Sequence, residues 1–341
     1  MRVGFNPHKD IKQQKSDYFH QVIVPVHIPD QEGYFRDSLT IFKYCMESML
    51  LTCHSKTYFT IVNNGSCKEV VAFLDGLFND NKIHELIHCS GIGKLNAVLK
   101  GISGHNFQLV TIADSDVLFL NNWQQETYAV FEAFPKAGTV CPTPSAKSFK
   151  TYTANIWVEL FFSKSLYFTP VKNPKALQDF AASIGNPDFY HKCHLEKYLT
   201  VTDNNFQAVV GAGHFFATYR GTVFEKLNQR YSDYMLGGDS EKEILDIPVI
   251  KKGFWRLSTL DNFACHMGNV KEDWMQDRLK QIKPNDYNPE SELILNKINT
   301  TKLGYWIKSK MFSKFFLRKE ILIWCLKYKG LSKETAGEYL K

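Results

Sequence analysis

The sequence predicts an α/β protein with a doubly wound, mostly parallel sheet flanked by helices and with a helical extension at its C-terminal end. Three observations lead to this prediction. Apolar strand patterns and amphipathic helix patterns alternate from residue 22 to residue 113. Polar or acidic residues directly follow several of these strands. Residues 301–341, in contrast, combine many lysines and arginines with aromatic side chains.

The length and composition fit one large globular domain with an appendage. The chain has 341 residues, of which 44% are hydrophobic and 22% charged, enough to build a sizeable core. The polar N-terminal stretch and the lack of a long apolar run predict neither a secretory signal nor a transmembrane helix. The eight cysteines form no C-x-x-C pair, so we expect reduced thiols and a cytoplasmic protein.

Strands and helices are expected to alternate in the first third of the chain. The predicted strands are short, apolar and mostly β-branched: 22–28, 57–66, 83–90 and 107–113. The predicted helices between them have apolar residues three or four positions apart: 35–50, 68–78 and 91–102. Strands joined through helices form parallel sheets, which bind ligands beyond the carboxyl ends of their strands.

Candidate binding residues follow from this rule. The residues at the carboxyl ends of the first, second and fourth strands should converge on one crevice, and they are Pro25, Val26, Asn63, Asn64, Asp114, Ser115 and Asp116. Charges next to a buried strand are costly unless they are paired, which calls for an explanation of the two aspartates. An acidic turn that caps a strand is the structural alternative to a binding role.

A dinucleotide-binding site is a competing interpretation of the same sheet. Such a site needs G-x-G-x-x-G directly after the first strand, but this strand is followed by PVHIPDQEGY. The G-x-G at Gly91 and Gly93 comes three strands into the chain. The sequence therefore disfavours a nicotinamide or flavin site.

Four short motifs in order point to a known family. They resemble motifs of family-2 glycosyltransferases of the GT-A fold, and they read VIVPVHI, IVNNGS, GIGKLNAVLKGI and ADSDVLFL. Two positions depart from the family pattern. Asparagines occupy positions 63 and 64, where an acidic residue is usual, and Gly238 precedes Asp239, where glutamate is usual.

The resemblance also implies a domain organisation. Residues 1–20 would be an N-terminal segment, and residues 21–270 a GT-A glycosyltransferase domain. Its nucleotide-sugar half would span 21–120 and its acceptor half 121–270. Residues 271–341 would then form a basic, aromatic-rich helical extension.

An enzyme of this family would move a sugar from a UDP- or GDP-sugar to a glycan or lipid-linked glycan, with inversion. The leaving diphosphate gains negative charge, which Mn²⁺ or Mg²⁺ can stabilise as a Lewis acid. Asp114 and Asp116 are the candidate metal ligands. The resemblance adds His266, in DNFACHMGN, as a further ligand; a turn cap or core histidine is its alternative role. Lys94, at a helix start, is placed to touch phosphate or nucleotide.

The acceptor hydroxyl must also lose a proton. In GGDSEKE, 237–243, the resemblance implies that Asp239 is the catalytic base, with Glu241 and Glu243 as nearby alternatives. The alternative is a helix start, where acidic residues favour the dipole. Trp157, Tyr219 and Trp255 are candidates either for stacking on a sugar or for the core.

The C-terminal extension carries the positive charge. Residues 301–341 hold ten Lys or Arg and three Asp or Glu, whereas the whole chain has a net charge of +6, so the first 300 residues are near −1. Basic, aromatic-rich helices of this kind bind anionic membrane surfaces. The alternative is that they pack back on the domain with solvated lysines. No recognition motif supports nucleic-acid binding, so none is expected.

Two further functions stay open at this point. A sugar-phosphate nucleotidyltransferase shares the sheet but carries a glycine-rich triphosphate loop after its first strand, which PVHIPDQ is not. A catalytically weak scaffold that binds a nucleotide-sugar or a membrane without turnover is favoured by the asparagines at 63–64 and by the glycine before Asp239.

Overall fold

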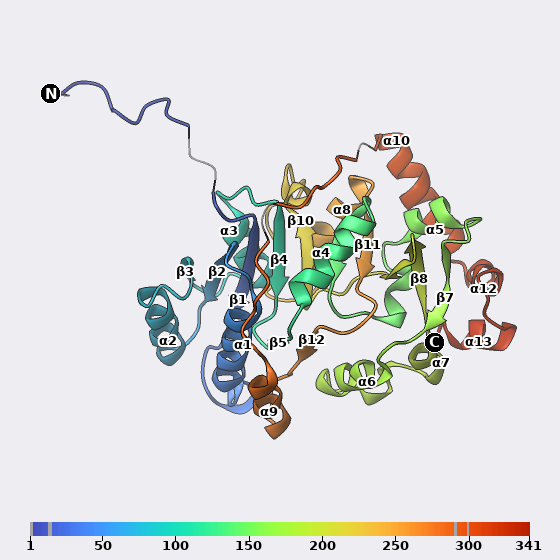
Figure 1. The fold of residues 1–341 in the computed structure, drawn as a ribbon, viewed down its shortest axis with the longest axis horizontal. Coiled ribbons are helices and arrows are strands. Elements are labelled where there is room, and N and C mark those ends of the chain that lie inside the picture. The colour runs from blue at the N-terminus through green and yellow to red at the C-terminus, as the bar shows by residue number, and fades with distance from the viewer. Residues whose placement is uncertain (1–2, 13–15, 290–291, 299) are drawn as a thin grey trace.

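The computed structural model describes residues 3–12, 16–289, 292–298 and 300–341. Within them, a ten-stranded sheet has the order β3-β2-β1-β4-β10-β6-β11-β9-β8-β7 (Figure 1). Its strands are β1 (His20–Val26), β2 (Thr57–Asn64), β3 (Glu85–Cys89), β4 (Leu109–Ala113), β6 (Ala137–Cys141), β7 (Leu166–Pro170), β8 (Lys197–Asp203), β9 (Phe206–Val210), β10 (Phe216–Arg220) and β11 (Trp255–Ser258). A second, small sheet pairs β5 (Val117–Phe119) with β12 (Ala264–His266).

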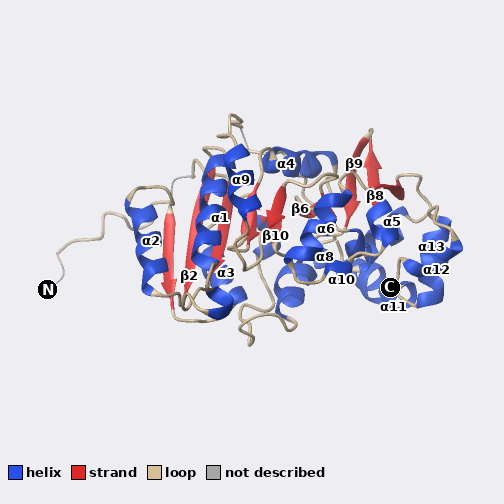
Figure 2. Cartoon of the chain, turned by 90° about the horizontal axis from the view of Figure 1, so that it is seen from below, coloured by secondary structure: helices blue, strands red, loops and turns tan. Residues whose placement is uncertain are grey.

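Helices flank the large sheet and build the C-terminal extension (Figure 2). The α-helices are α1 (Ser38–Thr52), α2 (Lys68–Asn79), α3 (Lys94–Ile102), α4 (Trp123–Ala133), α5 (Ala154–Leu160), α6 (Pro174–Ser183), α7 (Lys192–Glu196), α8 (Ile247–Lys251), α9 (Asp273–Gln281), α10 (Lys302–Tyr305), α11 (Phe312–Phe316), α12 (Lys319–Tyr328) and α13 (Lys333–Glu338). The 3₁₀ turns are η1 (Gly33–Phe35), η2 (Ala146–Lys150), η3 (Pro187–Phe189) and η4 (Gly221–Phe224), and η5 (Lys242–Asp246) and η6 (Trp306–Met311) are π-helical.

The predicted α/β architecture is confirmed. β3, β2, β1 and β4 are parallel neighbours, and α1, α2 and α3 connect them in the predicted order. The predicted boundaries differ by a few residues. The first strand ends at Val26 rather than at Ile28, and α1 begins at Ser38 because Phe35 belongs to the 3₁₀ turn η1.

Both faces of the parallel half are covered, as a doubly wound sheet requires. Along β1, Val22 and Val24 pack in the cluster that includes side chains of α1 and α2. Ile23 lies on the opposite face, in the cluster that includes Ala97 of α3. Alternating side chains of one strand therefore serve two cores, which explains why its sequence is continuously apolar.

The second half of the large sheet is mixed. β10 lies between β4 and β6 and is antiparallel to both, and β7, β8 and β9 form an antiparallel meander. After β10 the chain makes only the 3₁₀ turn η4. A Cβ at Gly221 would lie 1.9 Å from the carbonyl oxygen of Phe107, so only glycine fits this turn.

Within the C-terminal extension, α9 packs against α1, and the segment from α10 to α13 packs on the end of the sheet opposite α2 (Figures 1 and 2). It contributes buried side chains to the largest core cluster, namely Phe316, Leu322, Cys325, Leu326, Leu331, Ala336 and Tyr339. None of the described helices is long and apolar enough to cross a membrane. All eight cysteines are free thiols, as expected.

Candidate functional site

The two aspartates lie in a tight turn at the carboxyl end of β4. The backbone N–H of Asp114 donates to the carbonyl of Phe215 at 2.8 Å, and the N–H of Met267 donates to the carbonyl of Asp116 at 2.8 Å. Ser115 forms the tip of the turn between them. Two segments distant in the sequence therefore fix the backbone of this turn, and β5 continues from it into the pair with β12 (Figure 1).

This strand pairing brings His266 to Asp116. In the antiparallel register, His266 is opposite Val117, the residue directly after Asp116. Nε2 of His266 lies 3.4 Å from Oδ2 of Asp116, and its Nδ1 is 2.9 Å from the hydroxyl of Ser183 at the end of α6. The hydroxyl thus orients the imidazole toward the carboxylate.

Asp116 is in an environment that disfavours its charge. Burial raises the pKa of its carboxyl group; His266 opposes this shift, and the neighbouring charge of Asp114 adds to it. Its Oδ1 atom is buried and has no hydrogen-bond partner among the residues that the structure describes. A buried, unsatisfied carboxylate oxygen is costly, so this atom is suited to meet a cation.

Lys94 forms an ion pair with the other aspartate. Its Nζ atom lies 2.5 Å from Oδ1 of Asp114, and both side chains are largely buried. Burial alone would lower the pKa of Lys94, but Asp114, together with the more distant Glu241 and Asp116, raises it overall. The charge of Lys94 therefore interacts with three carboxylates, those of Asp114, Asp116 and Glu241.

The start of α3 also holds the loop that carries the candidate base. The N–H of Lys94 donates to the carbonyl of Met235 at 2.9 Å. The side chain of Asn96 accepts from the N–H of Ser232 and donates to its carbonyl, each at 2.8 Å. Gly93 is left-handed with φ +91°, and a Cβ there would lie 2.7 Å from the carbonyl oxygen of Tyr234. The glycine-rich start of α3 is therefore needed for this close contact.

Asp239 and Glu241, which follow this loop, differ in exposure and in their ion-pair partners. Asp239 is 74% exposed and forms an ion pair with Lys242 at 3.4 Å. Glu241 is 30% exposed and lies 3.3 Å from Nδ1 of His214. Gly238 has φ +62°, and a Cβ would lie 2.6 Å from the ring of Tyr234, so this position favours glycine.

His214, Asp246 and Arg256 were not identified from the sequence. Nε2 of His214 lies 2.7 Å from Oδ1 of Asp246, and the guanidinium of Arg256 is 2.8 Å from the same oxygen. Asp246 and Arg256 are both buried. A chain of four charged groups thus runs from Arg256 through Asp246 and His214 to Glu241. Arg256 could have indicated this cluster in the sequence, because it is a charged residue within the largely apolar stretch FWRLS.

This chain sets the charge states of its members. Burial would lower the pKa of His214, but its hydrogen bonds to Asp246 and Glu241 raise it to about 9. The hydrogen bond from His214 in turn lowers the pKa of Glu241. Near neutral pH, His214 is therefore an imidazolium between two carboxylates, and Glu241 is ionised.

The asparagines at the end of β2 use their side chains to shape turns. The side-chain oxygen Oδ1 of Asn63 accepts a hydrogen bond from the backbone N–H of Ser66 at 3.0 Å. Oδ1 of Asn64 accepts one from the backbone N–H of Ile92 at 2.8 Å. Pro25 and Val26 are buried at the end of β1, where Val26 pairs with Asn63. Because β1 pairs with both β2 and β4, the ends of these three strands lie side by side at one edge of the sheet, with both asparagine amides engaged within the protein.

The three aromatic residues considered for sugar stacking are core residues. Trp157 and Tyr219 are completely buried, and Trp255 is 8% exposed. None of the three rings is therefore accessible enough to stack on a ligand.

A divalent cation would fit this site only with ligands from the substrate. No group of three or more His, Cys, Asp or Glu side chains within the described residues is arranged to hold a metal ion. The unpartnered oxygen of Asp116, beside His266, supplies a hard oxygen donor. Mg²⁺ and Mn²⁺ sites of this kind commonly use one or two carboxylates, and phosphate oxygens and waters complete the shell.

Neither a protein-family model nor a curated protein sequence matches this chain. Three similar solved structures are glycosyltransferases. TarS 1–349 from S. aureus in complex with UDP-GlcNAc has 11% identity and a TM-score of 0.42, over 75% of this chain and 60% of that one. TarS 1–349 without the ligand has 8% identity and a TM-score of 0.43, over 91% and 81%.

The third is the mannosyltransferase PcManGT from Pyrobaculum calidifontis in complex with GDP-Man and Mn²⁺. It has 12% identity and a TM-score of 0.42, over 94% of this chain and 74% of that one. Glycosyltransferases are thus among the solved structures that this chain resembles, and the chain spans less than two thirds of the TarS chain in the UDP-GlcNAc complex.

Proposed function

We propose that this chain is an inverting, metal-dependent glycosyltransferase that moves a sugar from a UDP- or GDP-sugar to a glycan or lipid-linked glycan. One observation carries the proposal. At the carboxyl ends of parallel strands, an acidic turn meets a lysine at a helix start, and a histidine lies beside its second carboxylate. This set of charges suits a nucleotide diphosphate and its counter-ion.

In this proposal the donor diphosphate lies at the acidic turn. Asp116 and His266, joined by Asp114 once Lys94 leaves it and by oxygens of the diphosphate, would hold Mn²⁺ or Mg²⁺. The metal would act as a Lewis acid toward the leaving diphosphate. Lys94 exchanges its ion pair with Asp114 for contact with a phosphate oxygen. Its positive charge then offsets the negative charge that develops as the bond between C1 of the sugar and the diphosphate oxygen breaks.

The acceptor hydroxyl attacks C1 from the face opposite the diphosphate, which inverts the configuration. A new C1–oxygen bond forms, and the hydroxyl proton passes to a carboxylate. We assign this proton to Glu241, with Asp239 as the alternative. Glu241 interacts with Lys94 and is held by His214, whereas Asp239 is mostly exposed and paired with Lys242.

A transfer assay over a panel of UDP- and GDP-sugars, with Mn²⁺ or Mg²⁺ and with a chelator, tests the proposal. We expect turnover of one donor that is lost with the chelator and in Asp116→Ala. Asp203→Ala, which removes an exposed carboxylate at the end of β8, is the matched control and should keep full activity. Donor binding without turnover over the whole panel would instead indicate the scaffold function.

A further inference from the structure

The helix formed by α10, η6 and α11 has an unusual distribution of side chains. Its inner side, which faces the domain, contains half-buried or buried Tyr305, Lys308, Ser309, Phe312 and Phe316. Two of these five are polar. The large apolar residues of the helix that remain are on its outer side. A helix that merely covers a core has a polar outer side, so the exposed apolar residues are the unusual feature of this helix.

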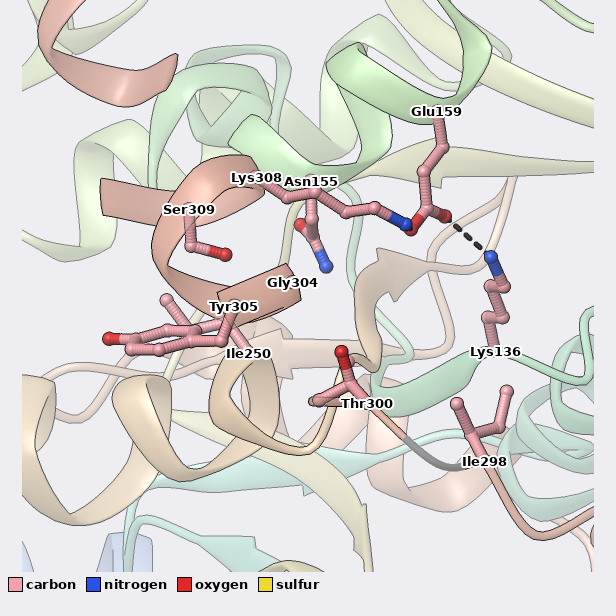
Figure 3. Close-up of a pocket in the computed structure, with 11 residues that line it drawn as sticks. Lys136, Asn155, Glu159, Ile250, Ile298, Thr300, Gly304, Tyr305, Lys308 and Ser309 are labelled. Atoms are coloured by element: carbon pink, nitrogen blue, oxygen red, sulfur yellow. Dashed lines mark hydrogen bonds and ion pairs between the residues drawn. The ribbon is translucent and has the colours of Figure 1, made fainter. Parts of the chain in front are cut away.

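Specific contacts hold the inner side in place. Nζ of Lys308 lies 2.7 Å from Oε1 of Glu159, and Nζ of Lys136 lies 2.7 Å from Oε2 of the same residue. Figure 3 shows the two lysines on either side of Glu159, beside a pocket between this helix and the domain. The ring of Phe316 packs against buried Trp157, with centroids 4.7 Å apart. The orientation of the helix is therefore fixed, and the same residues always face outward.

The outward residues, which we name the basic apolar face, combine apolar side chains with cations. Its members are exposed: Leu303, Trp306, Ile307, Lys310, Met311, Lys314, Phe315 and Arg318. Leu303 is 65% exposed, Phe315 55% and Trp306 50%. The guanidinium of Arg318 lies over the ring of Phe315, 5.1 Å from its centroid. From residue 301 to residue 319 the sequence has no acidic residue.

We propose that the basic apolar face binds the surface of an anionic lipid bilayer. Lysine and arginine side chains attract acidic headgroups, while tryptophan, phenylalanine and leucine side chains enter the boundary between headgroups and acyl chains. The basic apolar face suits an anionic bilayer because all its charged side chains are positive and because they alternate with large apolar side chains. This inference goes beyond the proposed function and does not depend on it.

Flotation of the full chain with vesicles tests this assignment. The vesicles contain phosphatidylcholine with or without about 30% phosphatidylglycerol, and the salt concentration is varied. We compare Trp306→Ser/Phe315→Ser and Lys310→Glu/Lys314→Glu with matched controls at the other end of the molecule. The controls are Phe78→Ser, an exposed aromatic residue of α2, and Lys82→Glu/Lys100→Glu, which changes the net charge equally.

We expect the wild-type chain to float with anionic vesicles and to be released by salt. Each pair of substitutions in the face should reduce the bound fraction at least about tenfold, whereas the controls bind as the wild type does. Absence of flotation, or unchanged flotation of both variants, overturns the proposal. So does a wild-type dimer in sedimentation that Trp306→Ser/Phe315→Ser converts to a monomer, because the face would then contact a second copy.

The vesicle experiment and the transfer assay test the two proposals independently of each other. The face lies on the C-terminal extension, away from the acidic turn, so its variants should keep transfer to a soluble acceptor when no vesicles are present. A chain that floats but transfers no sugar would overturn the proposed function and leave the lipid surface intact.

Discussion

Nζ of Lys94 lies 2.5 Å from Oδ1 of Asp114, so the first residue of α3 neutralises the first carboxylate after β4. Without a donor, this lysine occupies a carboxylate that the proposed metal would need. The same cation would stabilise the diphosphate once the donor binds. A metal ion that binds Asp114 must displace Lys94, and phosphates that bind Lys94 must displace Asp114. Binding of the metal and binding of the phosphates are therefore coupled through this ion pair.

Lys94→Gln should therefore affect metal and nucleotide in opposite directions. Removing the competing cation frees Asp114, so Mn²⁺ alone should bind more tightly. UDP or GDP with Mn²⁺ should bind more weakly, by about tenfold, because a partly buried charge-assisted contact is lost. Calorimetry with and without nucleotide measures both effects, and Lys100→Gln on the exposed end of α3 is the control. Weaker binding of Mn²⁺ alone would contradict the competition.

The identity of the base can be decided with two nearly isosteric changes. Glu241→Gln should lower kcat by about 10²-fold or more, since a positioned base is lost, and leave donor binding intact. Asp239→Asn should stay within about twofold of the wild type, because its exposed side chain contacts Lys242 rather than the site. Single-turnover kinetics beside donor titrations separate the two effects. The reverse result, with only Asp239→Asn inactive, would assign the proton to Asp239.

The charge of His214 predicts a pH dependence of stability. Its pKa is raised from the ordinary value near 6.5 to about 9, so folding favours the protonated form. The stabilisation is fully present below about pH 6.5 and is lost as the pH rises through about 9. His214→Gln should therefore lower the free energy of unfolding at pH 6 by about 1–3 kcal/mol, with a difference that shrinks toward pH 10. Urea melts at several pH values measure it, and a constant difference would contradict the linkage.

Packing of the C-terminal extension can be measured with two leucines. Leu326 is completely buried in the largest core cluster, and its replacement by alanine should cost about 2–5 kcal/mol of the free energy of unfolding. Leu303 is 65% exposed on the basic apolar face, so Leu303→Ala should change stability by less than about 0.5 kcal/mol. Urea melts of both variants provide the comparison. Equal small effects would mean that the extension does not contribute to the core.

The parallel half of the fold and the placement of its acidic turn could be predicted from the amino-acid sequence alone. Strand and helix periodicity is a local property, and in a parallel sheet the carboxyl ends of neighbouring strands must meet at one edge. The positions of Asn63, Asn64 and Asp114 at that edge followed from these two rules. The hydrogen bonds of the asparagine side chains could not be predicted in this way, because they depend on backbone groups of other loops.

The partners of the charged groups and the orientation of the helix at 302–316 could not be predicted in this way, because they depend on how distant segments pack. Asp246 and Arg256 meet His214 across three elements, and long-range pairing leaves no periodic signal in a single sequence. The basic, aromatic composition of residues 301–341 fitted both a packed and a lipid-binding helix. The structure shows that Phe316 is buried while Trp306 is half-exposed, because Glu159 and Trp157 fix which side of the helix meets the domain.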